Sequence, residues 1–173
     1  MDEVILVDHW DNDIGIEEKE ACHRLPVKLH RAFSVFIVNR ERQMLIQKRA
    51  AIKKTWPGFW SNACCSHPRK GETLSQAVPR RLLEELGFTC PLSHIFTFRY
   101  KADYSEEFGE NEIDHVLIGE FNGVVTPNKD EIDEWQFISL DQLRRDIADN
   151  PGKYTPWFMK ALPEVMKYIA GHL

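Results

Sequence analysis

The residues in this chain with the clearest capacity for chemistry are histidines and glutamates that could hold a metal ion. Five residues are the candidates, namely His23, His30, His67, Glu110 and Glu112. The two glutamates are separated by one residue, so in an extended segment their side chains point to one side. Three imidazoles and two carboxylates form a mixed nitrogen and oxygen site that suits Zn²⁺, Mn²⁺ or a related first-row ion.

Other interpretations of these residues stay open at this point. A lone histidine is usually on the surface or hydrogen-bonded in the core, and we assign that role to His9, His94, His115 and His172. Glu110 could be solvated loop charge, whereas Glu112 begins an apolar run and is harder to explain in that way. Five protein ligands would also be unusual for a structural zinc site, which is normally tetrahedral.

Cys65 is a candidate for a reactive thiol. It lies two residues before His67, so in an extended segment the two side chains face one side and Cys64 faces away. A thiol in such a place could act as an acid or a nucleophile. Cys22, Cys64 and Cys90 are better explained as small buried hydrophobic residues.

Composition limits the classes of protein and partner. With 173 residues, 43% of them hydrophobic and 28% charged, we expect one globular domain over residues 1–173. The net charge of −5 disfavours a nucleic-acid partner, so an anionic substrate needs a local basic patch, which Lys48-Arg49 and Lys53-Lys54 could supply.

Location and assembly follow from the same composition. No apolar run approaches the ~18–20 residues that cross a bilayer, and the N-terminus lacks the basic region of a secretory signal. Four cysteines without metal-finger spacing favour a reducing compartment. We therefore expect a cytoplasmic protein without a membrane partner, as a monomer or weak homodimer.

The elements that must position these residues are strands interleaved with a few helices. Apolar runs predict strands at residues 4–7, 30–38, 43–48, 95–100, 112–120 and 135–139. The clearest helix is Thr73–Leu86, with a capping box at its start, Gly87 after its end, and Pro79 as an anomaly that should bend it. Asp141 should cap a further helix, and Thr155 a last one. The pattern predicts a mixed α/β sheet covered by helices.

The run Arg80–Phe88 resembles the second half of the Nudix box, a loop and helix whose carboxylates hold divalent metal on a diphosphate. Counting back, Glu72 falls on the first glutamate of the box. There are two departures: Ser66 replaces the opening glycine, and Arg81 replaces a metal-binding glutamate. An amphipathic helix with Arg80–Glu84 and Arg81–Glu85 ion pairs would explain the run equally well.

A wider resemblance decides between these interpretations. The ordered motifs Trp-Pro-Gly-Phe-Trp60, Asn62-Ala-Cys-Cys-Ser-His-Pro68 and Glu110-Asn-Glu112 make the chain, from Lys19 to Trp157, similar to the type I isopentenyl-diphosphate isomerases. The resemblance implies a Nudix fold, a mixed β-sheet sandwiched by helices. It also implies an isomerase of isoprenoid biosynthesis that interconverts isopentenyl and dimethylallyl diphosphate through a tertiary carbocation.

The resemblance also implies roles for individual residues. Cys65 and Glu112 would be the acid and base on opposite faces of the substrate, with Tyr100 nearby and Trp157 beside the carbocation. The set His23, His30, His67, Glu110 and Glu112 would hold one Mn²⁺ or Zn²⁺. Glu85 and the backbone carbonyl of Cys65 would hold Mg²⁺. The substrate diphosphate would be bound by Lys19, Arg49, Lys53 and Arg81.

Two rival functions remain at the level of the sequence. A Nudix hydrolase of a nucleoside diphosphate derivative needs the full set of box carboxylates, which Arg81 interrupts. A non-enzymatic Nudix-like binding module would have no reason to keep Cys65, Glu112 and the histidines together.

Overall fold

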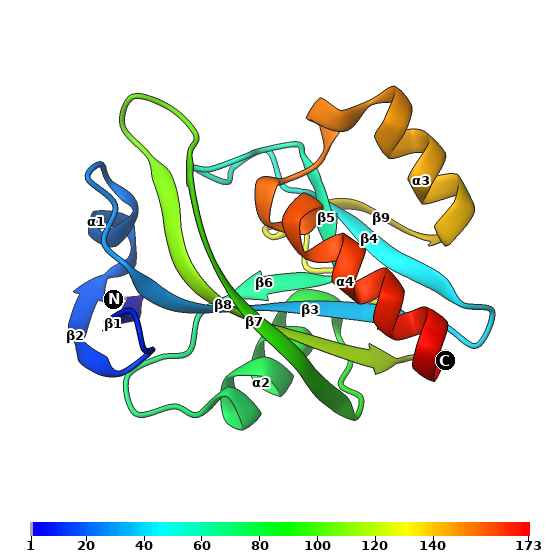
Figure 1. Ribbon diagram of the computed structural model, residues 1–173, viewed down its shortest axis with the longest axis horizontal. Coiled ribbons are helices and arrows are strands. Elements are labelled where there is room, and N and C mark those ends of the chain that lie inside the picture. Colours follow the sequence, from blue (N-terminus) through cyan, green and yellow to red (C-terminus); the bar gives the residue numbers. More distant parts are fainter. Residues whose placement is uncertain (1) are drawn as a thin grey trace.

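The computed structural model of the protein describes residues 2–173, whose strands form one mixed sheet (Figure 1). The strands are β1 (Glu3–Val7), β2 (Asp13–Glu18), β3 (His30–Val38), β4 (Gln43–Arg49), β5 (Trp60–Asn62), β6 (Cys64–Ser66), β7 (Leu92–Asp103), β8 (Gly109–Glu120) and β9 (Ile132–Ser139). The helices are α1 (Lys19–His23), α2 (Leu74–Leu86), α3 (Leu140–Asp149) and α4 (Pro156–His172), with a 3₁₀ turn at Pro151–Lys153. Among the helices of the described residues, none is long and apolar enough to cross a membrane.

The central strand β3 sets the register of the sheet. It runs parallel to β8, with His30 opposite Glu112, and β7 runs antiparallel to β8, with Tyr100 opposite the same Glu112. On its other side β3 pairs with β6, where Ser34 lies opposite Cys65. Because directly opposite residues share a face of the sheet, this register brings chemically active side chains from four strands together.

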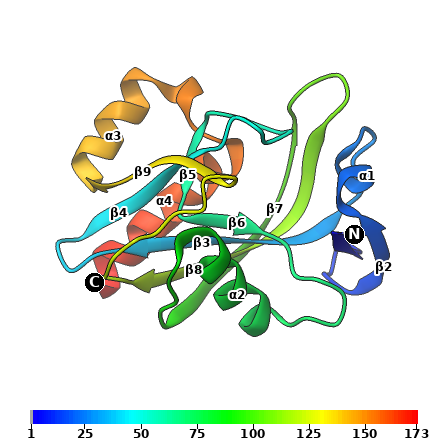
Figure 2. The same ribbon diagram turned by 180° about the vertical axis from the view of Figure 1, so that it is seen from behind.

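Helices cover both faces of the sheet. Phe36 and Val38 of β3 pack into a core shared with α3 and α4, whereas Val35 and Ile37 pack into a core shared with α2. The two opposite views show α4 and α2 on different faces (Figures 1 and 2). The predicted mixed sheet sandwiched by helices is confirmed.

The predicted box helix is also confirmed. The Thr73 N–H donates to Gln76 Oε1 at 2.9 Å in a capping box, and the helix begins at the next residue. Gly87 ends the helix with a φ of 75°, the left-handed conformation that favours glycine. The helix continues through Pro79. Because proline has no N–H, the carbonyl of Ser75 has no helical hydrogen-bond partner, but Ser75 is exposed.

Other element predictions need correction. Asp141 does not cap α3: β9 runs directly into this helix, and Ser139 Oγ accepts the cap hydrogen bond from the Gln142 N–H at 3.3 Å. The sequence pattern also misses β2 and α1. β2 is an edge strand with exposed isoleucines, so it lacks the alternation of a buried strand. α1 is too short to show a helical period.

Candidate active site

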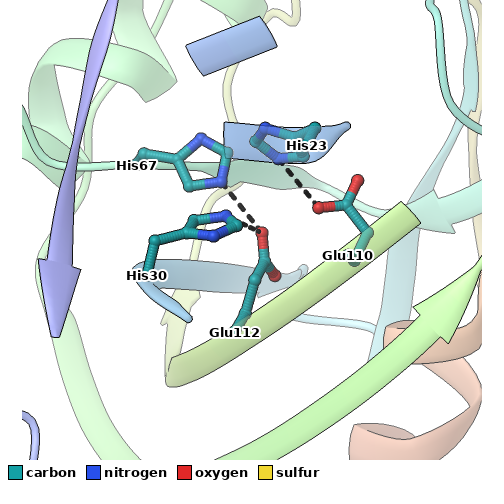
Figure 3. A group of neighbouring side chains, drawn as sticks. All are labelled: His23, His30, His67, Glu110 and Glu112. Carbon is teal, nitrogen blue, oxygen red and sulfur yellow. Dashed lines mark hydrogen bonds and ion pairs between the residues drawn. The ribbon is translucent and has the colours of Figure 1, made fainter. Parts of the chain in front are cut away.

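The five predicted metal ligands meet at one end of the sheet. Their side chains point toward one another, and one ligand atom from each lies within 4.8 Å of the others (Figure 3). His23 comes from α1, His30 from β3 and His67 from the segment after β6. Glu110 and Glu112 both come from β8. Residues far apart in the sequence therefore form one cluster, which is almost entirely buried.

The backbone around the histidines decides which ring nitrogen faces the carboxylates. His23 Nδ1 lies 2.6 Å from the carbonyl of Lys19, and His30 Nδ1 lies 2.9 Å from the carbonyl of Lys28. A carbonyl can only accept, so both Nδ1 atoms donate, and in a neutral ring Nε2 is then the nitrogen that can bind a metal ion. This arrangement orients histidines in metal sites.

The Nε2 atoms face carboxylate oxygens, and a cation bound between them would contact both kinds of atom. His23 Nε2 lies 2.9 Å from Glu110 Oε2, an oxygen without a hydrogen-bond partner among residues 2–173, and His30 Nε2 lies 3.2 Å from Glu112 Oε1. His67 Nε2 lies 2.9 Å from the same Glu112 oxygen. These ring nitrogens and carboxylate oxygens form a ligand set that is suited to a divalent ion such as Zn²⁺ or Mn²⁺.

Burial shifts the protonation of this cluster. Burial lowers the pKa of His67 to about 3, so this ring is neutral and able to bind a metal ion. Burial raises the pKa of Glu112, but hydrogen bonds from His30 and His67 outweigh it and hold that pKa well below its ordinary value. Tyr100 donates to Glu112 Oε2 at 2.5 Å, and burial raises the pKa of its phenol, which stays protonated.

Cys65 lies beside this cluster with its sulfur held by polar groups. The thiol donates to Asn62 Oδ1 at 3.0 Å, and the indole Nε1–H of Trp157 donates to Sγ at 2.9 Å. Burial, followed by the charge of Asp114, raises the pKa of Cys65 to about 12. Cys64 is fully buried in the opposite core, as its position in an extended segment predicts.

A cavity of about 390 Å³ joins the thiol to the metal cluster. Cys65, Glu112, Tyr100 and Trp157 all line it, as do Phe33 and Phe108. It is also lined by the four cations that the resemblance assigns to diphosphate, which form its cationic part, namely Lys19, Arg49, Lys53 and Arg81. The cavity therefore combines apolar and aromatic side chains, the Cys65 thiol and the Glu112 carboxylate with this cationic part.

Near its end, α2 carries Arg81, which lines the cationic part of the cavity, and the buried Glu85. Arg81 Nη2 lies 2.5 Å from Glu85 Oε1, so the predicted ion pair on one helix face is present. Burial, with a further contribution from Glu131, raises the pKa of Glu85 even though Arg81 opposes this. The negative charge of this buried carboxylate is therefore not fully compensated by neighbouring cations, which suits Mg²⁺, an ion that prefers oxygen ligands.

Comparison with known proteins agrees with this geometry. The NUDIX domain family model matches residues 28–158. Isopentenyl-diphosphate Delta-isomerase 1 of Aromatoleum aromaticum is 44% identical over 165 residues, which cover 95% of this chain and 93% of that protein. Isopentenyl-diphosphate Delta-isomerase 2 of Photorhabdus laumondii is 44% identical over 163 residues, which cover 94% of this chain and 92% of that protein. The chain belongs to the isopentenyl-diphosphate Δ-isomerase family.

Solved structures place this isomerase family member among Nudix folds. DR0079 from Deinococcus radiodurans superposes with a TM-score of 0.69 at 18% identity, over 85% of this chain and 89% of that chain. The ORF135 protein of E. coli superposes with a TM-score of 0.62 at 18% identity, over 84% of this chain and 94% of that chain. At this identity the likeness shows the fold alone.

Three further residues around Cys65 were not identified by sequence reasoning. Asn62 is fixed by donating to the Val35 and Cys64 carbonyls, at 3.1 and 3.0 Å, so its oxygen must face Cys65. Ser34 and Asp114 are buried behind the thiol, and Ser34 Oγ donates to Asp114 Oδ2 at 2.7 Å. Burial raises the pKa of Asp114 well above its ordinary value. Asn62 belongs to the motif Asn62–Pro68, which could have pointed to it, whereas Ser34 and Asp114 look like ordinary strand residues in the sequence.

Proposed function

We propose that this protein interconverts isopentenyl diphosphate and dimethylallyl diphosphate. The observation that carries the proposal is one cavity shared by a thiol, a carboxylate and four cations, in a chain 44% identical to named isomerases. The substrate is small, apolar at one end and anionic at the other. Both parts of the cavity match it.

The reaction moves one double bond, so one proton must be added and another removed. Cys65 and Glu112 carry these transfers from opposite faces of the five-carbon unit. With the thiol protonated and the carboxylate ionised, Cys65 gives a proton to the alkene and Glu112 takes one from the neighbouring carbon. The thiolate and carboxylic acid that remain catalyse the reverse direction. Before another forward turnover Cys65 regains a proton and Glu112 loses one, so the complete cycle conserves protons.

The intermediate is a tertiary carbocation, which needs a neighbour that attracts positive charge without bonding to it. The indole face of Trp157 has this property. In the structure the Arg49 guanidinium lies 5.2 Å from the centre of the Trp157 ring, so a cation can reach this face. Tyr100 holds Glu112 in place through its hydrogen bond of 2.5 Å.

Two ions complete the proposal. His23, His30, His67, Glu110 and Glu112 would hold one Zn²⁺ or Mn²⁺, which would fix the orientation and proton affinity of Glu112. Glu85 and the carbonyl of Cys65 would hold Mg²⁺, which neutralises part of the diphosphate charge. Lys19, Arg49, Lys53 and Arg81 would bind the remaining phosphate oxygens.

The wider setting is part of the same proposal. We place the protein in the cytoplasm and in isoprenoid biosynthesis, as a single domain over residues 1–173. It would act on a small molecule, without nucleic acid or membrane, as a monomer or weak homodimer. Size-exclusion chromatography coupled to light scattering tests the oligomeric state.

A direct assay tests the function. The protein, loaded with Zn²⁺ or Mn²⁺, is incubated with isopentenyl diphosphate and Mg²⁺, and the products are followed by NMR. Dimethylallyl diphosphate should accumulate until the two isomers reach equilibrium, and Cys65→Ala should not form it. Release of inorganic phosphate without isomerisation would instead favour a Nudix hydrolase.

A further inference from the structure

Glu131 lies beside the cationic part of the cavity, between two of the cations proposed to bind diphosphate. Its Oε1 lies 3.0 Å from Arg81 Nη2, and its Oε2 is in contact with Lys53 Nζ. Burial opposes ionisation of Glu131, but Lys53 and Arg81 outweigh it and lower the pKa of this carboxyl. Glu131 is therefore a fixed negative charge where the substrate is most negative.

The backbone holds Glu131 in this position. Its carbonyl accepts from the Ala50 N–H at 3.0 Å, and its own N–H donates to the Asn128 carbonyl at 3.0 Å. The Asn128 N–H in turn donates to the Glu85 carbonyl at 2.9 Å. Because the segment is attached to both the end of α2 and the loop after β4, the Glu131 backbone is held beside the two cations.

A diphosphate that binds these cations must therefore approach Glu131. A phosphate oxygen hydrogen-bonded to Arg81 or Lys53 would lie within about 6 Å of the Glu131 carboxylate. At an effective dielectric constant of about 20, two like unit charges at this distance lower an affinity by roughly 100-fold. The nearby cations screen part of this repulsion, so we take about 10-fold as the lower bound.

We propose that Glu131 makes diphosphate binding depend on a divalent ion, because its fixed charge repels a diphosphate that arrives without one. The inference rests on the proposed function for the roles of Lys53 and Arg81. A divalent ion beside Glu85 offsets the repulsion, so the site selects the ion-loaded diphosphate. Glu131 is in this sense a specificity-determining residue of the diphosphate site.

The experiment measures the affinity for inorganic pyrophosphate by calorimetry, with and without Mg²⁺. The protein is first loaded with Zn²⁺ at the histidine and glutamate cluster, and excess zinc is removed. In Glu131→Gln, metal-free pyrophosphate should bind at least about 10-fold more tightly than in the wild type. The factor by which Mg²⁺ raises the affinity should fall by a similar amount.

Two variants control for net charge and for side-chain size. Glu134→Gln removes the same charge from the exposed Glu134 of β9, which pairs with Lys48 at 2.8 Å, and should leave both affinities within about 2-fold. Glu131→Asp keeps the charge and should keep most of the Mg²⁺ dependence.

Several results would overturn the inference. One is an equal loss of pyrophosphate affinity with and without Mg²⁺ in Glu131→Gln, which would mean that Glu131 only holds the cations in place. Unchanged affinities in that variant, or a wild type that ignores Mg²⁺, would overturn it as well. No turnover is measured, so the outcome is separate from the isomerase assay, which can fail or succeed by itself.

Discussion

Replacing Trp157 should separate two contributions that its indole makes beside Cys65. The indole N–H donates to Cys65 Sγ at 2.9 Å and lies 3.0 Å from Ser61 Oγ. Its face attracts cations, as the Arg49 guanidinium 5.2 Å from the ring centre indicates. Phenylalanine keeps an aromatic face and loses the N–H, whereas leucine loses both.

The structure sets the size of each effect. A hydrogen bond of this kind contributes about 0.5–1.5 kcal/mol, so Trp157→Phe should lower kcat by roughly 2- to 13-fold. The aromatic face contributes about 1–2 kcal/mol to a desolvated cation, so Trp157→Leu should lose a further factor of roughly 5–30. Phenylalanine and leucine are both apolar, so the gap between them reports the face rather than burial.

The assay is the rate of dimethylallyl diphosphate formation at saturating substrate, with melting temperatures measured because Trp157 is buried. An ammonium analogue of the cation, carrying the diphosphate, should bind the wild type more tightly than Trp157→Leu. Trp135→Leu, a change at a partly exposed tryptophan of β9, should leave kcat and analogue binding unchanged. Equal kcat for the two Trp157 variants, or equal analogue affinity in wild type and Trp157→Leu, would refute a role for the face.

Three further predictions concern the thiol, the metal cluster and the substrate cations. Cys65→Ala should lower kcat by roughly 10²–10⁴, whereas Cys64→Ala should leave it nearly unchanged; equal losses would reject the assignment. Exhaustive chelation, or His67→Ala, should abolish activity and lower the melting temperature, because the ion that links the buried imidazoles and carboxylates is lost or held less tightly; full activity after chelation would exclude a functional ion. Arg81→Ala should raise KM for isopentenyl diphosphate more than it lowers kcat, and neither variant nor wild type should hydrolyse dinucleoside polyphosphates in a phosphate-release assay.

The sequence by itself determined the features that depend on local spacing. The capping box and the glycine at the end of α2 follow from hydrogen bonds within one turn. The i, i+4 spacing of Arg81 and Glu85 predicted their contact, because such residues share one helix face. The opposite orientations of Cys64 and Cys65 follow from the alternation of side chains along an extended segment.

Only the tertiary structure decided which of these local features meet. The pairing of His30 with Glu112, and of Glu112 with Tyr100, depends on strand register. A shift of one residue would turn every side chain to the other face, and no local pattern specifies the partner strand.

The contacts around the thiol and around the cations proposed to bind diphosphate also join residues that are far apart in the sequence. Trp157 contacts Cys65 although the two are 92 positions apart in the sequence, and Glu131 contacts Arg81 across 50 positions. In the sequence Glu131 is one acidic residue in a charged stretch, and Asp114 is one polar residue in an apolar strand. Packing alone places Glu131 between two cations and Asp114 behind the thiol, because burial and partners, not residue type, decide what a carboxylate does.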